Sequence, residues 1–102
     1  VFYNTGLAMY SIMFEAARNA VELEGLPITP TSYKAGLESL KGYDANGLMA
    51  PITVTAEDHG GGGQTRIEMW DGEAWVPQTE WISEYGDVVW DVVKESSAKY
   101  EQ

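Results

Sequence analysis

The sequence contains no cysteine and a single histidine, His59. The lack of cysteine excludes a disulfide framework and a thiolate zinc site. Basic residues are scarce too: six Lys and Arg stand against 16 Asp and Glu, which gives a formal net charge of −10. A phosphate backbone would be repelled by this charge, so we expect no nucleic-acid partner. Anionic membrane surfaces are disfavoured for the same reason.

Long apolar runs are also missing. No stretch of the sequence approaches the length of a membrane span, and none has the pattern of a secretory signal peptide. The 102 residues suffice for one small domain, and a hydrophobic content of 44% allows a buried core. The chain begins at Val1 rather than Met, which we interpret as a processed protein or a fragment of a longer chain.

Two helices are predicted in the first half. The first covers residues 5–24, with Thr5 as N-cap and Gly25 as the residue that ends it. Its first half is apolar on nearly every side, which predicts deep burial, whereas its second half is amphipathic. The second helix begins with Thr29 as N-cap and Pro30 in the first helical position, and it ends at Gly42.

Strands and a final helix are predicted in the second half. A strand is expected at residues 52–55, followed by a hairpin of strands 66–70 and 73–76 around the turn Asp71-Gly72. This register sets Trp70 opposite Glu73. One face of the hairpin is predicted to be core, and it carries Ile67, Met69, Ala74 and Val76. The other face is predicted to be half-exposed, and it carries Glu68, Trp70, Glu73 and Trp75. A helix is expected near residues 85–99, with a valine-rich stripe.

Few residues have the types and spacing that catalysis or metal binding needs. Glu57, Asp58 and His59 are adjacent, but neighbouring residues of an extended segment point to alternate sides, so we interpret them as a polar turn. The four glycines at 60–63 lack the Lys-Ser/Thr of a phosphate-binding loop. The DANG motif at 44–47 lacks the later carboxylate of a calcium loop and predicts an ordinary turn. We expect no enzyme activity, no metal site and no cofactor.

Several motifs, in order, resemble one family. They are YNTG at residues 3–6, FEAARNA at 14–20, AGLE at 35–38, DHG at 58–60, and WDG at 70–72 followed by Trp75. Their order resembles the C-terminal portion of periplasmic solute-binding proteins of the branched-chain amino-acid type. These proteins are the extracytoplasmic receptors of ABC importers, and the resemblance extends over nearly the whole chain.

The resemblance implies a partial type I periplasmic-binding-protein fold of the α/β class. The chain would be a single C-terminal fragment of a two-lobed protein, with a helical pair at 1–43, strands and a β-hairpin at 50–82, and a terminal helix at 83–102. Phe2, Tyr3 and Asn4 match a position that lines the family's cleft, although the alternative that Phe2 and Tyr3 are core residues is favoured by their apolar character. The implied ligand is an amino acid or amide, the implied partner is an ABC transporter permease, and the implied location is periplasmic or extracytoplasmic.

Two other functions stay open. The chain could be a stand-alone structural or protein-interaction α/β domain without a ligand, or a hydrolase or metal-assisted enzyme built around Glu57, Asp58 and His59. We also expect the chain to associate with itself, because its first helix and its sheet edges need more cover than its own elements supply.

Overall fold

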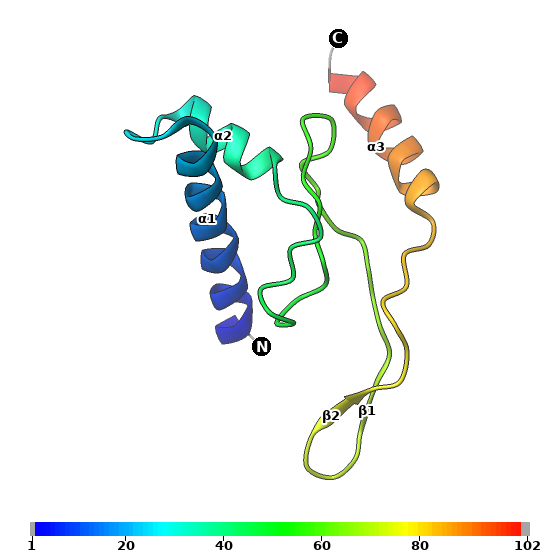
Figure 1. Cartoon of the computed structure of the whole chain (residues 1–102). Coiled ribbons are helices and arrows are strands. Elements are labelled where there is room, and N and C mark those ends of the chain that lie inside the picture. The colour runs from blue at the N-terminus through cyan, green and yellow to red at the C-terminus, as the bar shows by residue number, and fades with distance from the viewer. Residues whose placement is uncertain (1, 101–102) are drawn as a thin grey trace. The chain divides into compact units, whose positions relative to one another are not determined.

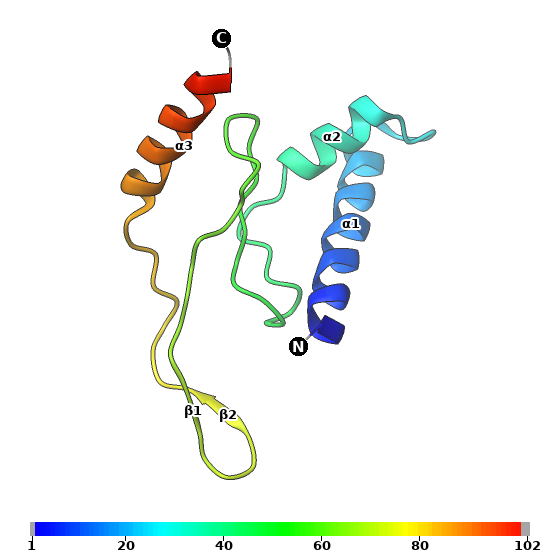
Figure 2. The ribbon, with the colours of Figure 1, turned by 180° about the vertical axis from the view of Figure 1, so that it is seen from behind.

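The protein is described by a computed structural model that covers residues 2–100 (Figures 1 and 2). Its elements are, in chain order, α1 (Phe2–Glu24), α2 (Pro30–Glu38), β1 (Glu68–Trp70), β2 (Trp75–Pro77) and α3 (Gly86–Tyr100). The chain divides into two compact units, one ending at Gly62 and the other beginning at Gly63.

The first unit is built on the contact between α1 and α2 (Figure 1). Ala16 and Ala20 of α1 are fully buried, and Gly36 of α2 faces both of them. Small residues on both sides let the two helices approach closely. Leu40 and Val54, which are also buried, complete the core, and the Val54 N–H donates to the Leu40 carbonyl at 3.0 Å. The core of this unit is therefore small and lies beside the second half of α1.

The beginning of α1 differs from the sequence prediction in two ways. The helix starts at Phe2 rather than Thr5, although it ends as expected before Gly25, which has a φ of +80°. Its apolar first half is exposed rather than deeply buried, as Tyr10 and Phe14 show with 63% and 74% of their surface accessible. The predicted burial is wrong here because α2, the one named element packed on α1, has nine residues and packs mainly on the second half, although its Tyr33 hydroxyl reaches the Met13 carbonyl at 3.3 Å.

The start of α2 confirms its prediction. Thr29 is the N-cap: its Oγ1 accepts from the Ser32 N–H at 3.1 Å, while the Ser32 Oγ accepts from the Thr29 N–H at 2.8 Å. This reciprocal pair satisfies two donors that a helix start leaves open. The helix ends at Glu38 with Ser39 as C-cap, earlier than the predicted end at Gly42.

The strand predicted at residues 52–55 is wrong. Within the described residues this segment forms a single bridge, between Tyr43 and Ile52, and otherwise runs as an irregular loop. The Thr53 N–H donates to the Gly61 carbonyl, and Gly61 adopts a φ of +68° that favours glycine. The neighbouring segment of residues 40–43 exchanges backbone hydrogen bonds with it only at Ile52 and Val54, and this short contact does not extend into a regular strand ladder.

The second unit contains the hairpin, in a different register from the predicted one. Trp70 pairs with Trp75 and Met69 with Val76, so four residues rather than two join the strands. The Asp71 carboxylate accepts from the backbone N–H groups of Glu73 and Ala74, both at 2.8 Å, and this stabilises the longer turn. The predicted core face is also wrong, since Met69 is 56% exposed.

The last helix, α3, begins at Gly86, one residue later than predicted, and none of its described residues is buried. Taken together, the described residues form three helices and one two-stranded antiparallel sheet. The expected partial α/β binding-protein fold, with a third strand after the helical pair, is therefore not what the chain adopts.

Candidate functional site

A polar groove of about 320 Å³ lies in the first unit. It lies between the middle of α1, the end of α2 and the loop that follows α2. Its lining residues are Glu15, Asn19, Ser39, Leu40, Lys41, Gly42, Tyr43, Asp44 and Asn46. Positive φ angles at Ala45 and Asn46 turn the loop back toward α1, in a turn that the DANG motif predicts.

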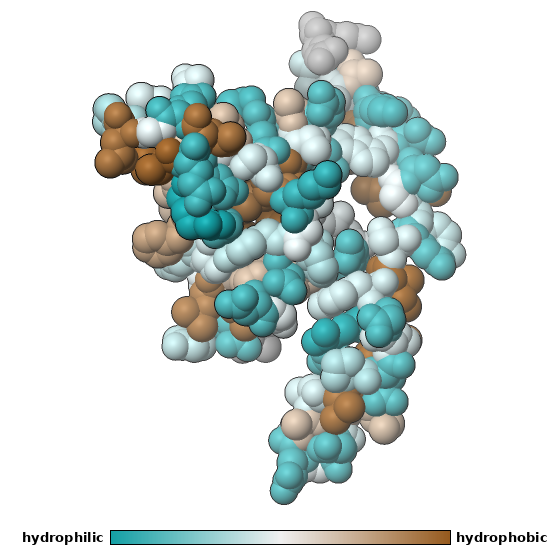
Figure 3. Space-filling view, in the orientation of Figure 1, coloured by the Kyte–Doolittle hydropathy of each residue, from teal (hydrophilic) through white to brown (hydrophobic). Residues whose placement is uncertain are grey.

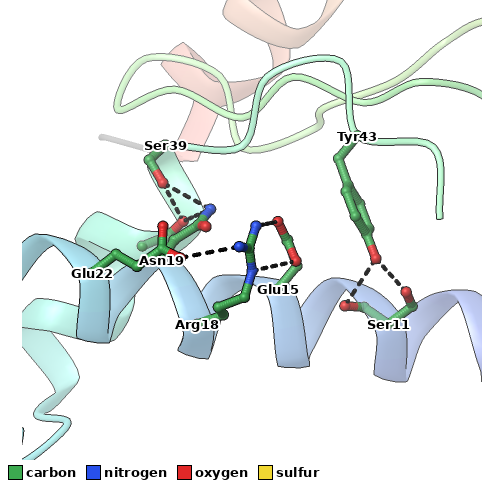
Figure 4. A network of polar contacts seen from close by, with 8 residues as sticks. Ser11, Glu15, Arg18, Asn19, Glu22, Ser39 and Tyr43 are labelled. Carbon is green, nitrogen blue, oxygen red and sulfur yellow. Dashed lines mark hydrogen bonds and ion pairs between the residues drawn. The ribbon is translucent and has the colours of Figure 1, made fainter. Parts of the chain in front are cut away.

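Glu15, on the α1 wall of this groove, belongs to a network of ion pairs on α1 (Figure 4). The Arg18 guanidinium pairs with Glu15 through two nitrogens, one of them Nε at 3.1 Å, and with Glu22 at 3.0 Å. The hydrogen bond from Arg18 lowers the pKa of Glu15 below its ordinary value. Glu15 is therefore a paired carboxylate and is poorly suited to act as a general acid at neutral pH.

Hydrogen bonds join the other walls to α1 (Figure 4). Asn19 Nδ2 donates to Ser39 Oγ at 3.1 Å and to the Gly36 carbonyl at 3.4 Å. The Tyr43 hydroxyl is hydrogen-bonded to the Ser11 hydroxyl. These hydrogen bonds hold the end of α2 and the following loop against α1. The polar side chains of the groove therefore serve mainly to join these segments.

The predicted turn at residues 57–60 forms and rests on α2. The Thr55 N–H donates to the Asp58 carbonyl at 2.9 Å, and the Gly60 N–H donates to the Asp58 carboxylate at 2.8 Å. His59 Nε2 lies 2.8 Å from Glu38 Oε1, which also pairs with Lys34. Within residues 2–100, no three His, Cys, Asp or Glu side chains gather in a way that could hold a metal ion.

Phe2, Tyr3 and Asn4 lie on the first turn of α1 rather than on a segment before it, and all three are exposed. They line neither the polar groove nor the groove that lies in the second unit around Arg66 and Trp81. Their role as ligand contacts stays a prediction.

A second groove, of about 420 Å³, lies in the second unit and was not predicted. Gln64, Thr65, Arg66, Glu68, Trp75 and Trp81 line it. The Arg66 guanidinium stacks 4.5 Å from the centre of the Trp81 ring, and Arg66 Nε donates to Glu68 at 2.7 Å. Thr65 and Ile82 bring these residues together by exchanging backbone hydrogen bonds of 2.7 and 3.0 Å. No local motif indicates the contact between Arg66 and Trp81, which lie 15 residues apart. The groove was therefore not predicted from the sequence.

Comparison with known proteins finds one informative likeness. No protein-family model and no curated protein matches the chain. A solved structure described as an ABC transporter permease from the Pseudomonas fluorescens group is similar, with 32% sequence identity and a TM-score of 0.77. The match includes 97% of this chain but only 26% of that protein. The chain thus spans about a quarter of the length of the protein that it matches.

This likeness corrects the interpretation drawn from the sequence motifs. The matched protein is described as a permease, so the identification as part of a periplasmic amino-acid receptor, with the binding-protein fold that it implied, is wrong. The link to ABC transporters is common to both. Among the described residues, no helix combines the length and apolarity needed to cross a membrane.

Proposed function

We propose that this chain is a structural segment of an ABC transporter component of the kind named in the description of the matched protein, a permease. The observation that carries the proposal is the likeness in both sequence and backbone over 97% of the chain. Because the chain corresponds to 26% of that protein, the activity and partners of a whole component are part of the proposal.

The contacts of the first unit support a scaffolding role. Three carboxylates of this unit are engaged in ion pairs: Glu15 and Glu22 pair with Arg18, and Glu38 pairs with Lys34 and His59. The groove side chains hold the loop onto α1 and α2. We therefore propose that the segment contributes shape and contact surface to the transporter and no catalytic group. An extracytoplasmic location, a small-molecule ligand and contact with a permease subunit remain predictions from the sequence.

A hybrid protein tests this proposal. The matching quarter of the Pseudomonas protein is replaced by this chain, and the hybrid is purified beside the unmodified protein. We expect a hybrid that unfolds cooperatively and retains the transporter subunits that the unmodified protein retains. A second hybrid, carrying a shuffled sequence of the same composition, is the control and is expected to aggregate.

The two hybrids give a clear decision. If the first hybrid behaves like the shuffled control, while the isolated 102-residue chain shows the helix content of its structure by circular dichroism, then the chain is not an equivalent of that segment and the proposal is wrong.

A further inference from the structure

An exposed apolar stripe follows the length of α1. We call it the heptad stripe, and its residues are Tyr3, Leu7, Tyr10, Phe14, Ala17 and Val21. Their spacings of four and three residues alternate, which is the spacing of the contact positions in helices that pack side by side. All but Ala17 are exposed, from 37% for Val21 to 77% for Tyr3. Apolar surface is visible over this unit in Figure 3.

The heptad stripe is separate from the surface that α2 covers. At 3.6 residues per turn, the stripe lies about a third of a turn around α1 from Ala16 and Ala20, the residues that face Gly36 of α2. Thus α2 cannot cover the stripe without giving up its observed packing against Ala16 and Ala20.

The exposed area of the whole chain shows how much surface is uncovered. A folded monomer of this mass is expected to expose about 5,700 Å², whereas this chain of 11.2 kDa exposes 8,006 Å². Both units contribute to this excess of about 2,300 Å², because α3 also has no buried residue, so the heptad stripe accounts for a part of it.

The stripe is also complementary to itself when reversed. In an antiparallel pair whose two-fold axis passes between Tyr10 and Phe14, Tyr3 of one copy faces Val21 of the other, Leu7 faces Ala17, and Tyr10 faces Phe14. Each large side chain thus meets a smaller or an aromatic one. A self-complementary patch of this kind is what a two-fold interface requires.

Charge agrees with the antiparallel direction. Residues 2–14 contain no charged side chain, and the charges of α1 begin at Glu15. In the antiparallel pair, the charged half of each helix lies beside the uncharged half of the other. In a parallel pair, the two charged halves would lie side by side, and each carries three Glu and one Arg between residues 15 and 24, so like net charges would repel.

We infer that a second copy of this chain covers the heptad stripe, with α1 packed antiparallel to α1 around a two-fold axis. This inference does not depend on the proposed transporter function, because its test uses only the 102-residue chain.

Size-exclusion chromatography with light scattering, from 1 to 200 µM, tests the pairing. We expect a mass twice that of the 11.2-kDa chain at the upper concentrations. Phe14→Glu is expected to raise the dissociation constant at least 100-fold. Val89→Glu, at a position on α3 that is also exposed, is the matched control and should leave it unchanged. Circular dichroism checks that both variants keep their helices.

Cross-linking tests the direction, since the chain has no cysteine of its own. Leu7→Cys mixed with Ala17→Cys should form a disulfide-linked dimer, and Leu7→Cys alone should not. Three results would overturn the inference: a monomer at 200 µM, a dimer that Phe14→Glu does not weaken, or linkage of Leu7→Cys to its own kind in preference to Ala17→Cys. A monomer would mean that another partner covers the stripe.

Discussion

Gly36 of α2 lies against the backbone of Ala16 in α1 so closely that a Cβ atom at residue 36 would come within 2.2 Å of the Ala16 carbonyl oxygen. The same Cβ would lie 2.6 Å from the backbone nitrogen of Ala20. Both neighbours are backbone atoms of a helix and cannot turn aside. The packing of the two helices therefore depends on the absence of a side chain at residue 36.

Gly36→Ala should separate the two helices. We expect the free energy of unfolding to fall by about 1–3 kcal/mol, the usual cost of forcing extra atoms into a packed contact, as measured by urea denaturation. Gly6→Ala is the matched control: Gly6 lies within α1 with open space around it, so alanine should stabilise the helix by about 0.5–1 kcal/mol. Equal effects of both changes would contradict the close contact.

Thr29→Ala should weaken the start of α2, because it removes the acceptor for the Ser32 N–H. Loss of such a cap costs about 0.5–2 kcal/mol of unfolding free energy, measurable by the same denaturation experiment. Thr31→Ala, an exposed change on the same turn, should alter stability by a few tenths of a kcal/mol at most. If Thr29→Ala left the free energy of unfolding unchanged, the cap would make no contribution to stability.

Leu40→Ala should affect the core more than any surface change. Leu40 is 3% exposed and packs in a core that contains few other large side chains. Removing a buried leucine side chain costs about 2–5 kcal/mol, so thermal unfolding should shift to markedly lower temperature. Leu26→Ala, at a position that is 77% exposed, should leave the transition nearly in place.

Glu38 should titrate below the ordinary glutamate pKa of 4.5, because its hydrogen bond to Lys34 and then that to His59 favour the ionised form. A pKa lowered by folding stabilises the fold above the ordinary value, and this contribution is lost as pH falls through the lowered value. Carboxyl NMR titration should show a larger rise of the Glu38 pKa in Lys34→Ala than in His59→Ala. The reverse order would contradict the arrangement.

Asp71→Ala should loosen the hairpin turn. The pKa of Asp71 is lowered by the hydrogen bonds from the backbone N–H groups of Ala74 and Glu73. Without this acceptor, amide hydrogen exchange at residues 73 and 74 should accelerate. In Asp71→Asn, whose side-chain oxygen can still accept, exchange should stay closer to that of the natural sequence. Protonation of the Asp71 carboxylate at acid pH should act in the same direction but more weakly than Asp71→Ala, because the neutral carboxyl keeps an accepting oxygen.

Some of the hairpin could be predicted from sequence. The predicted and observed registers differ by two residues, so Trp70 and Trp75 still share one face, as do Met69 and Val76. Side chains alternate along a strand with a period of two, so a register shift of two residues leaves the grouping of residues by face unchanged. The predicted grouping is therefore correct, although the predicted burial of one face is wrong. The turn length was wrong because the Asp71 carboxylate stabilises a four-residue connection that the Asp71-Gly72 pair alone does not reveal.

The sites could not be predicted in the same way. The polar groove joins Glu15 to Asp44 and Asn46, and the second groove joins Arg66 to Trp81. Each depends on contacts between residues far apart in sequence, such as the bond between Ser11 and Tyr43. The residues singled out from sequence, Phe2, Tyr3 and Asn4, lie apart from both grooves, on the first turn of α1.

The sequence by itself determined where the helices of the first unit meet their loops: Gly25 after α1, and Thr29 with Pro30 at the start of α2. These signals act through backbone geometry and hydrogen bonds within a few residues, so they need no distant partner. Only the tertiary structure decided that the apolar half of α1 is exposed and that residues 52–55 form no strand. Burial and strand pairing require a second surface, and whether one is present depends on how the whole chain packs.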